Sequence, residues 1–197
     1  MRIVDAGFLR SVTGIDQRKA IGLPEVCFIG RSNVGKSSLL NTLASRKIAR
    51  VGATPGATRL INLYRIGCEW EGGRHEALFS DFPGFGFSKV SKVVYRSWQS
   101  MIEGYMKGNQ WIRLVLWAFD IRRDFDELDH MLLEWLEENS LAFSLVLTKS
   151  DKEARGRCLQ AQQDFQRKLA SHDVFLFSSK AGDGRKELLA HIRRSIG

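Results

Sequence analysis

The sequence predicts a three-layer α/β fold, in which helices cover both faces of a mainly parallel sheet that includes one antiparallel hairpin strand. Short apolar runs, which are typical of buried strands, alternate with helical patterns along most of the chain. A glycine-rich loop joins the first of these runs, 26–29, to a helical pattern. The dipeptide Gly72-Gly73 separates two other runs and predicts a hairpin inside the sheet.

The expected elements follow an N-terminal extension, residues 1–23, which we expect to pack on a domain formed by residues 24–197. The expected strands are residues 26–29, 59–66, 76–80, 112–119, 142–147 and 174–177. The first expected helix ends near Arg46, and Asp124 with Glu127 is the expected start of a later one. The later helices are recognised by apolar side chains on one face, namely Val94, Trp98, Met101, Ile102 and Tyr105; Leu128, Leu132, Trp135 and Leu136; Phe165 and Leu169; and Leu188, Leu189 and Ile192.

The balance of charged residues is consistent with a polyanionic partner. Thirty Lys and Arg against 22 Asp and Glu give a net charge of +8, which would attract RNA, DNA or a membrane surface. General solubility explains such an excess equally well. No apolar run approaches membrane-spanning length and the N-terminus lacks a signal-peptide core, so we expect a soluble, cytoplasmic protein without a membrane partner.

The cysteines and histidines predict neither a disulfide framework nor a metal cluster. Cys27, Cys68 and Cys158 are far apart and odd in number, as expected of reduced cytosolic thiols. The four histidines are scattered along the chain without the short spacings of a zinc site.

The glycine-rich loop, residues 30–37, fits the phosphate-binding motif G-x-x-x-x-G-K-[ST] at every fixed position. Its strand–loop–helix setting is the one that this motif requires, so we expect a P-loop NTPase fold. Gly30 and Gly35 allow turns that a Cβ would block, and successive N–H groups then face phosphate oxygens. Lys36 would reach the β- and γ-phosphates, and the Ser37 hydroxyl would ligate Mg²⁺. The predicted nucleotide contacts of this loop are Gly30, Arg31, Ser32, Asn33, Val34, Gly35, Lys36 and Ser37.

A second motif, Asp81-Phe82-Pro83-Gly84, follows the expected strand 76–80. Ligands of parallel sheets bind at the carboxyl ends of the strands, so this tetrapeptide should lie near the phosphate loop. Asp81 would hold the water shell of Mg²⁺, and the N–H of Gly84 would sense the γ-phosphate. The pattern D-x-x-G is common in turns, and its position after a strand is what makes it informative here.

A third motif, Thr148-Lys149-Ser150-Asp151, follows the expected strand 142–147 and predicts a guanine site. The carboxylate of Asp151 offers two acceptors for the N1–H and the exocyclic amine of guanine, whereas adenine has no donor at either place. The aliphatic stem of Lys149 can cover the purine. Ser178-Ser179-Lys180 follows strand 174–177 and could offer an N–H to the guanine carbonyl. A charged surface turn would be the simpler interpretation if the tetrapeptide stood alone.

Together these motifs resemble those of a known family. The stretches GRSNVGKSSLLN, TPGATRLINLY, DFPGFGF and TKSD are similar to the EngB (YihA/YsxC) family of bacterial ribosome-biogenesis GTPases, which are Ras-like, translation-factor-class proteins. The resemblance implies Mg²⁺ with GTP or GDP as ligand, a role in large-subunit assembly, and a link to normal septation and cell division. It also implies further nucleotide contacts, namely Ser38, Gly56, Ala57, Thr58, Arg59, Leu60 and Phe177.

The chain departs from related proteins at three positions of these motifs. Most related GTPases carry Asn where this chain has Thr148, whose shorter side chain would lose part of the base-site hydrogen bonding or supply it differently. Phe82 and Phe85 stand where the family usually has Leu and Tyr. The loss of the tyrosyl hydroxyl at Phe85 leaves the backbone role of the motif intact.

The loop 51–58 is expected to contain the first switch. The resemblance favours Thr58, over Thr54, as the residue that joins Ser37 on Mg²⁺ and touches the γ-phosphate in the triphosphate state. Hydrolysis would then release this loop and the segment 84–92 in an order–disorder transition. The expected catalytic groups are Lys36, Thr58, Gly84 and Asn33.

Phe85 stands where Ras-like enzymes place a water-orienting Gln. An apolar ring cannot hold the attacking water, so we expect slow intrinsic turnover that depends on a partner or an ion. In related GTPases an Asn at the position of Asn33 ligates K⁺, which makes K⁺ a candidate ion. A hydrogen bond from Asn33 to its own loop is the equal alternative.

Basic residues flank both expected switches, at Arg46, Lys47 and Arg50 and at Lys89, Lys92 and Arg96. They would let the nucleotide state control contact with RNA phosphates, although a solvated helix face explains the second group nearly as well. We therefore expect a monomer that binds large-subunit ribosomal RNA or a pre-ribosomal particle. An RNA-binding assembly factor that uses GTP as a structural ligand and an ATP-dependent small-molecule kinase are the other functions considered. Hydroxyl-directed chemistry by a Ser/His/Asp set has no support in the sequence and is given little weight.

Overall fold

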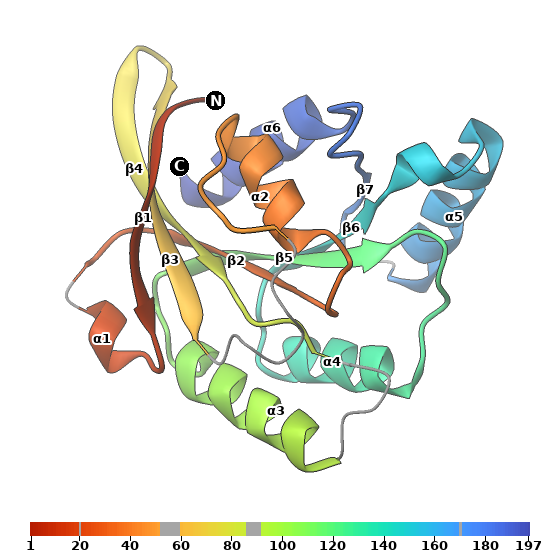
Figure 1. Ribbon diagram of the computed structural model, residues 1–197, viewed down its shortest axis with the longest axis horizontal. Helices are drawn as coiled ribbons and strands as arrows, with labels where there is room; N and C mark the ends of the chain where they lie inside the picture. Colours follow the sequence, from red (N-terminus) through yellow and green to blue (C-terminus); the bar gives the residue numbers. More distant parts are fainter. Residues whose placement is uncertain (20, 52–59, 86–91, 170) are drawn as a thin grey trace.

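A computed structural model describes residues 1–19, 21–51, 60–85, 92–169 and 171–197, and of residues 92–97 the backbone alone (Figure 1). Within these residues seven strands form one sheet in the order β1-β3-β4-β2-β5-β6-β7. The strands are β1 (Arg2–Val12), β2 (Glu25–Gly30), β3 (Ile61–Trp70), β4 (Gly73–Asp81), β5 (Ile112–Asp120), β6 (Phe143–Thr148) and β7 (Val174–Leu176). The helices are α1 (Asp16–Lys19), α2 (Lys36–Ala44), α3 (Lys92–Met106), α4 (Glu127–Glu138), α5 (Arg155–Lys168) and α6 (Arg185–Ile196), with a short 3₁₀ helix at Ser150–Lys152.

The sheet is mainly parallel and contains one antiparallel strand, as the sequence predicts. Strands β2, β4, β5, β6 and β7 run in one direction, and β3 runs antiparallel to both of its neighbours, β1 and β4. Glu71 and Gly72 form the tight turn between β3 and β4, with φ of 50° and 75°. Positive φ at both turn residues matches the twist of the paired strands.

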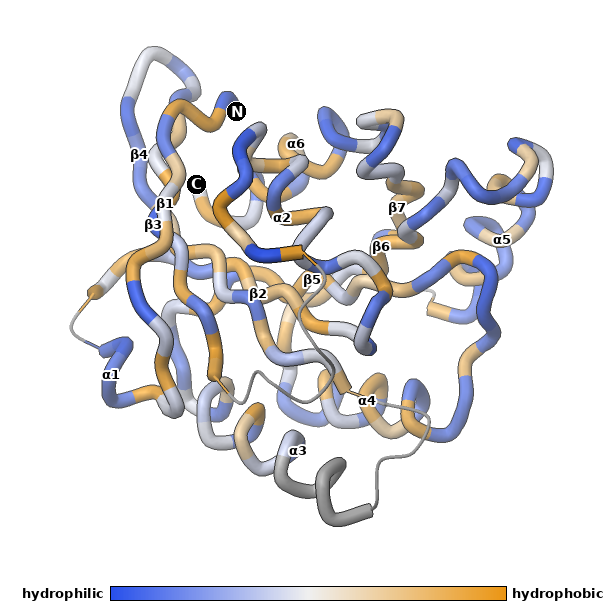
Figure 2. Tube along the Cα trace, in the orientation of Figure 1, coloured by the Kyte–Doolittle hydropathy of each residue, from blue (hydrophilic) through white to orange (hydrophobic). Residues whose placement is uncertain are grey.

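The alternation of side chains along β2 explains why helices cover both faces of the sheet (Figure 1). Val26 and Phe28 pack with apolar residues of α2 and α6, whereas Cys27 and Ile29 pack with those of α3, α4 and α5. Because both faces are buried, the strand is an uninterrupted apolar run. Figure 2 shows hydrophobic colours along the central strands and mainly hydrophilic colours along α5. The predicted three-layer architecture is confirmed.

Strand β1 and helix α1 lie in the segment 1–23, where no regular element was expected. β1 pairs with β3 as an edge strand, with irregular register between Ile3 and Asp5 and between Phe8 and Arg10. Asp5 and Arg10 are exposed, as charged side chains on an edge strand often are. These charges interrupt the apolar pattern, which is why the segment does not look like a buried strand in the sequence.

A buried polar cluster holds this N-terminal segment on the sheet. Arg18 and Glu25 are both fully buried, and Arg18 Nε donates to Glu25 Oε2 at 2.7 Å. Tyr105 of α3 donates its hydroxyl to Glu25 Oε1 at 2.7 Å, and Asn109 Nδ2 lies 3.3 Å from Oε2. The carboxylate is therefore satisfied from several elements, which a buried charge requires.

Two helix boundaries differ from the sequence-based expectation. The N-cap of α4 is Asp126, not Asp124: its carboxylate accepts from the N–H groups of Leu128 and Asp129 at 3.1 and 3.3 Å. Asp129 accepts in turn from the Asp126 N–H at 3.2 Å, which completes a capping box. Helix α2 ends at Ala44, two residues before Arg46, because the chain turns left-handed just beyond it.

Candidate functional site

The predicted motifs meet at one edge of the sheet. Strands β2, β4, β5 and β6 are parallel, so their carboxyl ends lie at the same edge (Figure 1). In the register of the sheet Phe28 lies opposite Asp81, and Asp120 lies opposite Thr148. The phosphate loop, the D-x-x-G motif and the third motif all start at these strand ends, which is where α/β sheets bind ligands.

The phosphate loop has the backbone conformation that its glycines predict. Gly30 has φ of 145°, and a Cβ added there would lie 2.3 Å from the Ala118 carbonyl oxygen. Asn33 and Gly35 are also left-handed, with φ of 63° and 102°. Helix α2 begins directly after Gly35 without a side-chain cap, so its first N–H groups are open to an anion.

The end of the phosphate loop lies beside the end of β4, where Lys36 and Ser37 meet Asp81. The Ser37 hydroxyl donates to Asp81 Oδ2 at 3.2 Å, and among the described residues no group hydrogen-bonds the buried Asp81 Oδ1. Burial lowers the pKa of Lys36, against the effect of the Asp81 carboxylate. Burial also raises the pKa of Asp81, while Lys36 and the Ser37 hydrogen bond act in the opposite direction. A hydroxyl and a carboxylate with a free oxygen form a donor set that suits Mg²⁺.

The D-x-x-G segment lies directly against the phosphate loop. A Cβ added to Gly84 would come within 2.7 Å of Ser32 Oγ and 2.8 Å of Ser32 N and Cα. The Ser32 N–H donates to the Phe85 carbonyl at 2.9 Å, and the Phe85 N–H reaches the Gly30 carbonyl at 3.4 Å. Phe82 is buried in the core. Only glycine permits such an approach of the two segments.

Thr148 contacts the phosphate loop. Its hydroxyl lies 2.6 Å from the Val34 carbonyl and 3.0 Å from the Phe119 carbonyl. One hydroxyl hydrogen can be donated to only one of these acceptors at a time. The shorter bond joins the end of β6 to the loop, so the hydroxyl supports the phosphate loop.

Lys149 also contacts the loop. The residue is left-handed, with φ of 60°, and its ammonium donates to the Asn33 carbonyl at 2.7 Å. It forms an ion pair with Asp120 Oδ2 at 2.9 Å. Burial would raise the pKa of Asp120, but hydrogen bonds from Arg122 and Lys149 outweigh it and hold the pKa well below its usual range. The aliphatic stem of Lys149 therefore crosses between the loop and β5.

Asp151 and Ser178 are brought together, as expected for one base site. Ser178 donates its hydroxyl to Asp151 Oδ1 at 2.8 Å, which lowers the pKa of this carboxyl. The side chain of Asp151 is 19% exposed, so the carboxylate is accessible and ionised at neutral pH. The Ala181 N–H donates to the Ser178 hydroxyl oxygen at 3.0 Å and orders the loop. Ser179 and Lys180 are exposed beside it.

The strand ends support this site through the backbone. Phe177 is buried; its N–H donates to the Leu147 carbonyl at 2.9 Å and its carbonyl accepts from the Ser150 N–H at 3.2 Å. Ser38 is half-buried in α2, and Leu60 is exposed just before β3. The other residues predicted for the first switch, Thr54, Gly56, Ala57, Thr58 and Arg59, lie outside the described residues, as does Lys89.

Comparison with known proteins identifies the family. The family model described as "50S ribosome-binding GTPase" matches residues 25–149. The "Probable GTP-binding protein EngB" of Syntrophus aciditrophicus is 43% identical over 199 residues, covering 100% of this chain and 98% of that protein. The protein of the same name from Chlorobium luteolum is 38% identical, covering 97% of this chain and 90% of its own length. The chain belongs to the EngB family of GTP-binding proteins.

Solved structures agree with this assignment. A crystal structure of a probable GTP-binding protein EngB has a TM-score of 0.66 and 26% identity, with 87% of this chain and 98% of that chain covered. The Era protein of Aquifex aeolicus has a TM-score of 0.72 at 23% identity, covering 89% of this chain and 57% of that one. The second likeness shows the shared GTPase fold.

A charged cluster beside the loop was not predicted from the sequence. Arg31 forms an ion pair with Asp126 and lies 3.6 Å from the buried Asp129. Arg123 contacts the same two carboxylates at 3.1 and 3.2 Å. Asp126 lies 95 positions from Arg31, so no local pattern could indicate the pair. The cluster fixes the second residue of the phosphate loop to the start of α4.

A Ser/His/Asp set does come together in the described part of the chain, but its position does not favour the hydroxyl-directed chemistry that was given little weight. Ser144 Oγ lies 2.8 Å from His191 Nε2, and His191 Nδ1 lies 3.3 Å from Asp173 Oδ2. Ser144 is buried within β6, however, so a substrate carbonyl has no access to its hydroxyl. These residues join α6 to the sheet, far along the strand from the predicted nucleotide site.

The remaining predicted absences concern metal ligands, disulfides and membrane spans in the described part of the chain. There, no group of three or more His, Cys, Asp or Glu could hold a metal ion, and the three cysteines are free. No helix in the described ranges is both long and apolar enough to cross a membrane.

Proposed function

We propose that this chain is a slow, Mg²⁺-dependent GTPase that acts as a switch in assembly of the large ribosomal subunit. The observation that carries the proposal is the convergence of three groups at one sheet edge: the open phosphate loop, the Ser37–Asp81 pair and the Asp151–Ser178 pair. Membership of the EngB family supports guanine nucleotide as the ligand.

The phosphate tail would lie over the loop and the N-terminus of α2. Lys36 would approach the β- and γ-phosphates. Burial lowers its pKa, and a phosphate anion beside it would oppose that shift by stabilising the charged ammonium. Ser37 and Asp81 would hold Mg²⁺, directly or through water, and Thr58 would join them in the triphosphate state. Bound Mg²⁺ would neutralise the charge that develops on the phosphates. Breaking the Ser37–Asp81 hydrogen bond would free both oxygens for the ion.

The base would lie between the third motif and Ser178-Ser179-Lys180. Asp151 would accept from the N1–H and the exocyclic amine of guanine, and Ser178 holds this carboxylate in place. The stem of Lys149 would cover one face of the purine while its ammonium stays on the loop carbonyl. Thr148 would act indirectly, through the Val34 carbonyl.

Slow turnover follows from the residue after Gly84. The Phe85 ring is buried against Trp98, with ring centroids 4.6 Å apart, and therefore offers no polar group to the attacking water. Asn33 is exposed, and its side-chain amide makes no hydrogen bond to any described residue. It is therefore available to ligate K⁺, which we propose as the stimulating ion.

The ribosomal partner is supported by the family and by charge. The matching family is described as ribosome-binding, and Lys47 and Arg50 are exposed just before the first switch. Ribosomal RNA phosphates would bind such residues. We place the protein in the cytoplasm, where ribosomes assemble, and link it to septation by family resemblance.

Multiple-turnover GTP hydrolysis tests the proposal. Wild-type protein should hydrolyse GTP slowly in Mg²⁺, stop when EDTA is added, and speed up with large-subunit particles. Potassium should accelerate it relative to sodium, and Asn33→Gly, which tolerates the left-handed loop backbone, should remove that difference while GDP is still bound. Two results would contradict the proposal: turnover that continues after Mg²⁺ is removed, and turnover that large-subunit particles do not change in potassium or in sodium.

An assembly factor that uses GTP as a structural ligand is the second candidate. The apolar Phe85 favours it, because a chain under selection for hydrolysis alone gains nothing from an apolar residue there. Thr58→Ala would separate the two. If this variant binds GTP, fails to hydrolyse it and still restores large-subunit assembly in depleted cells, hydrolysis is incidental.

A further inference from the structure

The D-x-x-G segment is held from α3 as well as from the phosphate loop. Trp98 lies on α3 and donates its indole N–H to the Pro83 carbonyl oxygen at 2.6 Å. The same indole packs on the Phe85 ring, at 4.6 Å between centroids and 45° between planes. Its side chain is 9% exposed, so water competes little for this hydrogen bond.

This hydrogen bond fixes the direction of the Gly84 N–H. The Pro83 carbonyl and the Gly84 N–H belong to the same planar peptide unit, which is trans. In a trans peptide these two bonds point in opposite directions. Since Trp98 draws the carbonyl towards α3, the N–H of Gly84 must point away from α3.

The other side of this peptide is the phosphate loop. Gly84 approaches Ser32 so closely that a Cβ would lie 2.7–2.8 Å from its atoms. No described residue accepts a hydrogen bond from the Gly84 N–H. The flanking donors are both accounted for, because Phe82 donates to the Phe28 carbonyl at 3.0 Å and Phe85 reaches Gly30. This donor, which has no acceptor among the described residues, therefore lies beside the loop that would hold the phosphates.

We propose that Trp98 is a positioning residue that aims the Gly84 N–H at the γ-phosphate and so sets the preference for triphosphate over diphosphate. The proposal rests on the proposed function, in which Gly84 senses the γ-phosphate. Trp98 does not touch the nucleotide; it acts through the Pro83–Gly84 peptide. GDP has no γ-phosphate, so its binding does not use this donor.

A purely structural role for Trp98 makes a different prediction. The ring contributes to the core between α3 and α4, where it lines a shallow groove with Ile102, Met131, Leu132 and Trp135. Loss of packing alone would lower the stability of the protein and reduce its affinities for GTP and GDP to a similar degree. Loss of the correct orientation of the Gly84 N–H would reduce the affinity for the triphosphate selectively.

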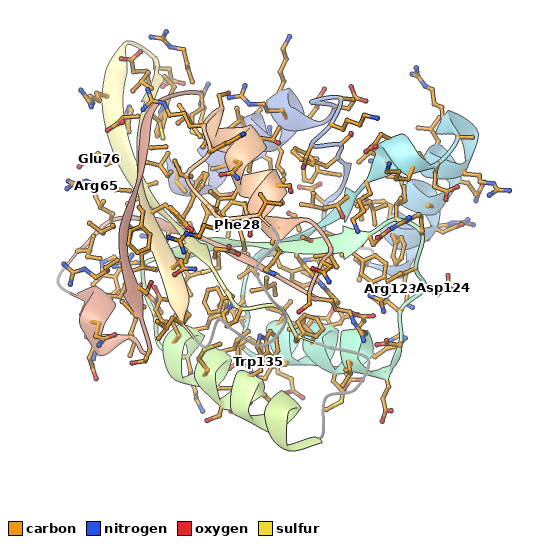
Figure 3. All side chains as sticks on the ribbon, viewed as in Figure 1. Phe28, Arg65, Glu76, Arg123, Asp124 and Trp135 are labelled. Carbon is orange, nitrogen blue, oxygen red and sulfur yellow. The ribbon has the colours of Figure 1, made fainter. Side chains whose placement is uncertain are left out.

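Trp98→Phe separates these two roles, because Phe keeps an aromatic ring beside Phe85 and removes the N–H donor. We expect its affinity for a non-hydrolysable GTP analogue to fall about three- to tenfold, the value of one hydrogen bond, with less than a twofold change for GDP. Trp135→Phe is the matched control: Trp135, labelled in Figure 3, lines the same groove from α4, and both affinities should be unchanged.

Each outcome decides a separate question. If wild-type protein binds neither nucleotide, the proposed function fails, and this inference with it. If wild type binds both and Trp98→Phe keeps the wild-type ratio of affinities, only the role of Trp98 is overturned. A second measurement needs no variant: in ¹H–¹⁵N spectra of the analogue complex, the Trp98 indole N–H should exchange slowly with water. Exchange as fast as that of an exposed indole would also overturn the proposal.

Discussion

Thr148 shows how one side chain of the third motif supports the phosphate loop. Its hydroxyl hydrogen-bonds the Val34 carbonyl, and the short Thr side chain is directed into the loop. Lys149 contacts the adjacent Asn33 carbonyl from the next position. The third motif therefore determines the shape of the phosphate loop, and a change in it should affect phosphate binding as well as base selection.

Thr148→Val is predicted to destabilise the protein and to reduce its affinity for GDP. Valine has nearly the same shape but leaves the buried Val34 carbonyl without its donor, so the free energy of unfolding should fall by about 1–2 kcal/mol. GDP affinity should fall with it, because the loop loses a constraint. Urea unfolding and GDP titration measure both effects. Thr148→Ser, which keeps the hydroxyl, should lie close to wild type; equal effects of Val and Ser would disprove the hydrogen-bond explanation.

Some features of single residues could be predicted from their sequence neighbours, and others could not. The left-handed turns at Gly30 and Gly35 follow from the motif and are observed. The contacts of Arg31 with Asp126 and of Thr148 with Val34 join residues far apart in the chain, and no periodicity encodes such pairs. They become visible only when the sheet brings the strand ends together.

At the scale of elements, the start of α4 is set by a capping box two residues beyond the expected position. Asp126→Ala should lower the free energy of unfolding by about 1–2 kcal/mol, because α4 loses its cap and Arg31 loses a partner. Chemical denaturation measures the loss. Asp124→Ala is the matched control and should have little effect, since Asp124 is exposed and precedes the cap. The opposite ranking would restore Asp124 as the start of the helix.

The contact between α6 and β6 should make stability depend on pH. Burial lowers the pKa of His191, against the effect of Asp173, and Arg194 lowers it further. The unfolded state, with a His pKa of about 6.5, therefore binds the proton more readily than the folded state. The free energy of unfolding should be highest above this pH and fall as the pH drops towards the folded pKa.

His191→Gln tests this coupling, because Gln can bond Ser144 without titrating. Urea unfolding at pH 7.5 and 5.5 should show a smaller loss of stability in the variant than in wild type. An identical pH dependence of the two proteins would show that His191 does not contribute to it. Wild type and variant share the remaining histidines, which cancel in this comparison.

Strands and helices with one clear period were predicted well, and those with interrupted patterns were not. The uninterrupted apolar run of β2 and the amphipathic face of α4 each indicated their element. β1 carries exposed charges within a strand that has only one neighbour, so its alternation is weak. The four-residue α1 is too short to have a period.

At the scale of the whole molecule, the parallel sheet places the phosphate loop, the D-x-x-G motif and the third motif at one edge. That arrangement could be inferred from the sequence, since parallel strands have their carboxyl ends together. The sequence could not indicate that β1 extends the sheet beyond the hairpin, or that Glu25 gathers Arg18 and Tyr105 into a buried cluster. The proposed nucleotide site could be predicted because it depends on local motifs, whereas these supports depend on tertiary packing.

The proposed binding to a ribosomal particle should draw on the charge of the whole molecule, which is +8. The affinity for large-subunit particles should fall linearly with salt on logarithmic axes. Replacing both Lys47 and Arg50 by Gln should reduce the slope by about 1–2, because each side chain would neutralise one RNA phosphate. The pair Arg155→Gln and Arg157→Gln on α5 is the control. A slope that changes only in the control would place the RNA surface on α5 instead.

The proposed preference for guanine depends on Asp151, and a nucleotide titration of Asp151→Asn tests it. Asp164→Asn, an exposed change on α5, serves as the control and should match wild type. We expect Asp151→Asn to lose about a hundredfold in GDP affinity and to gain affinity for xanthosine diphosphate, whose carbonyl can accept from the new amide. Unchanged GDP affinity with no gain for the xanthine nucleotide would contradict the account.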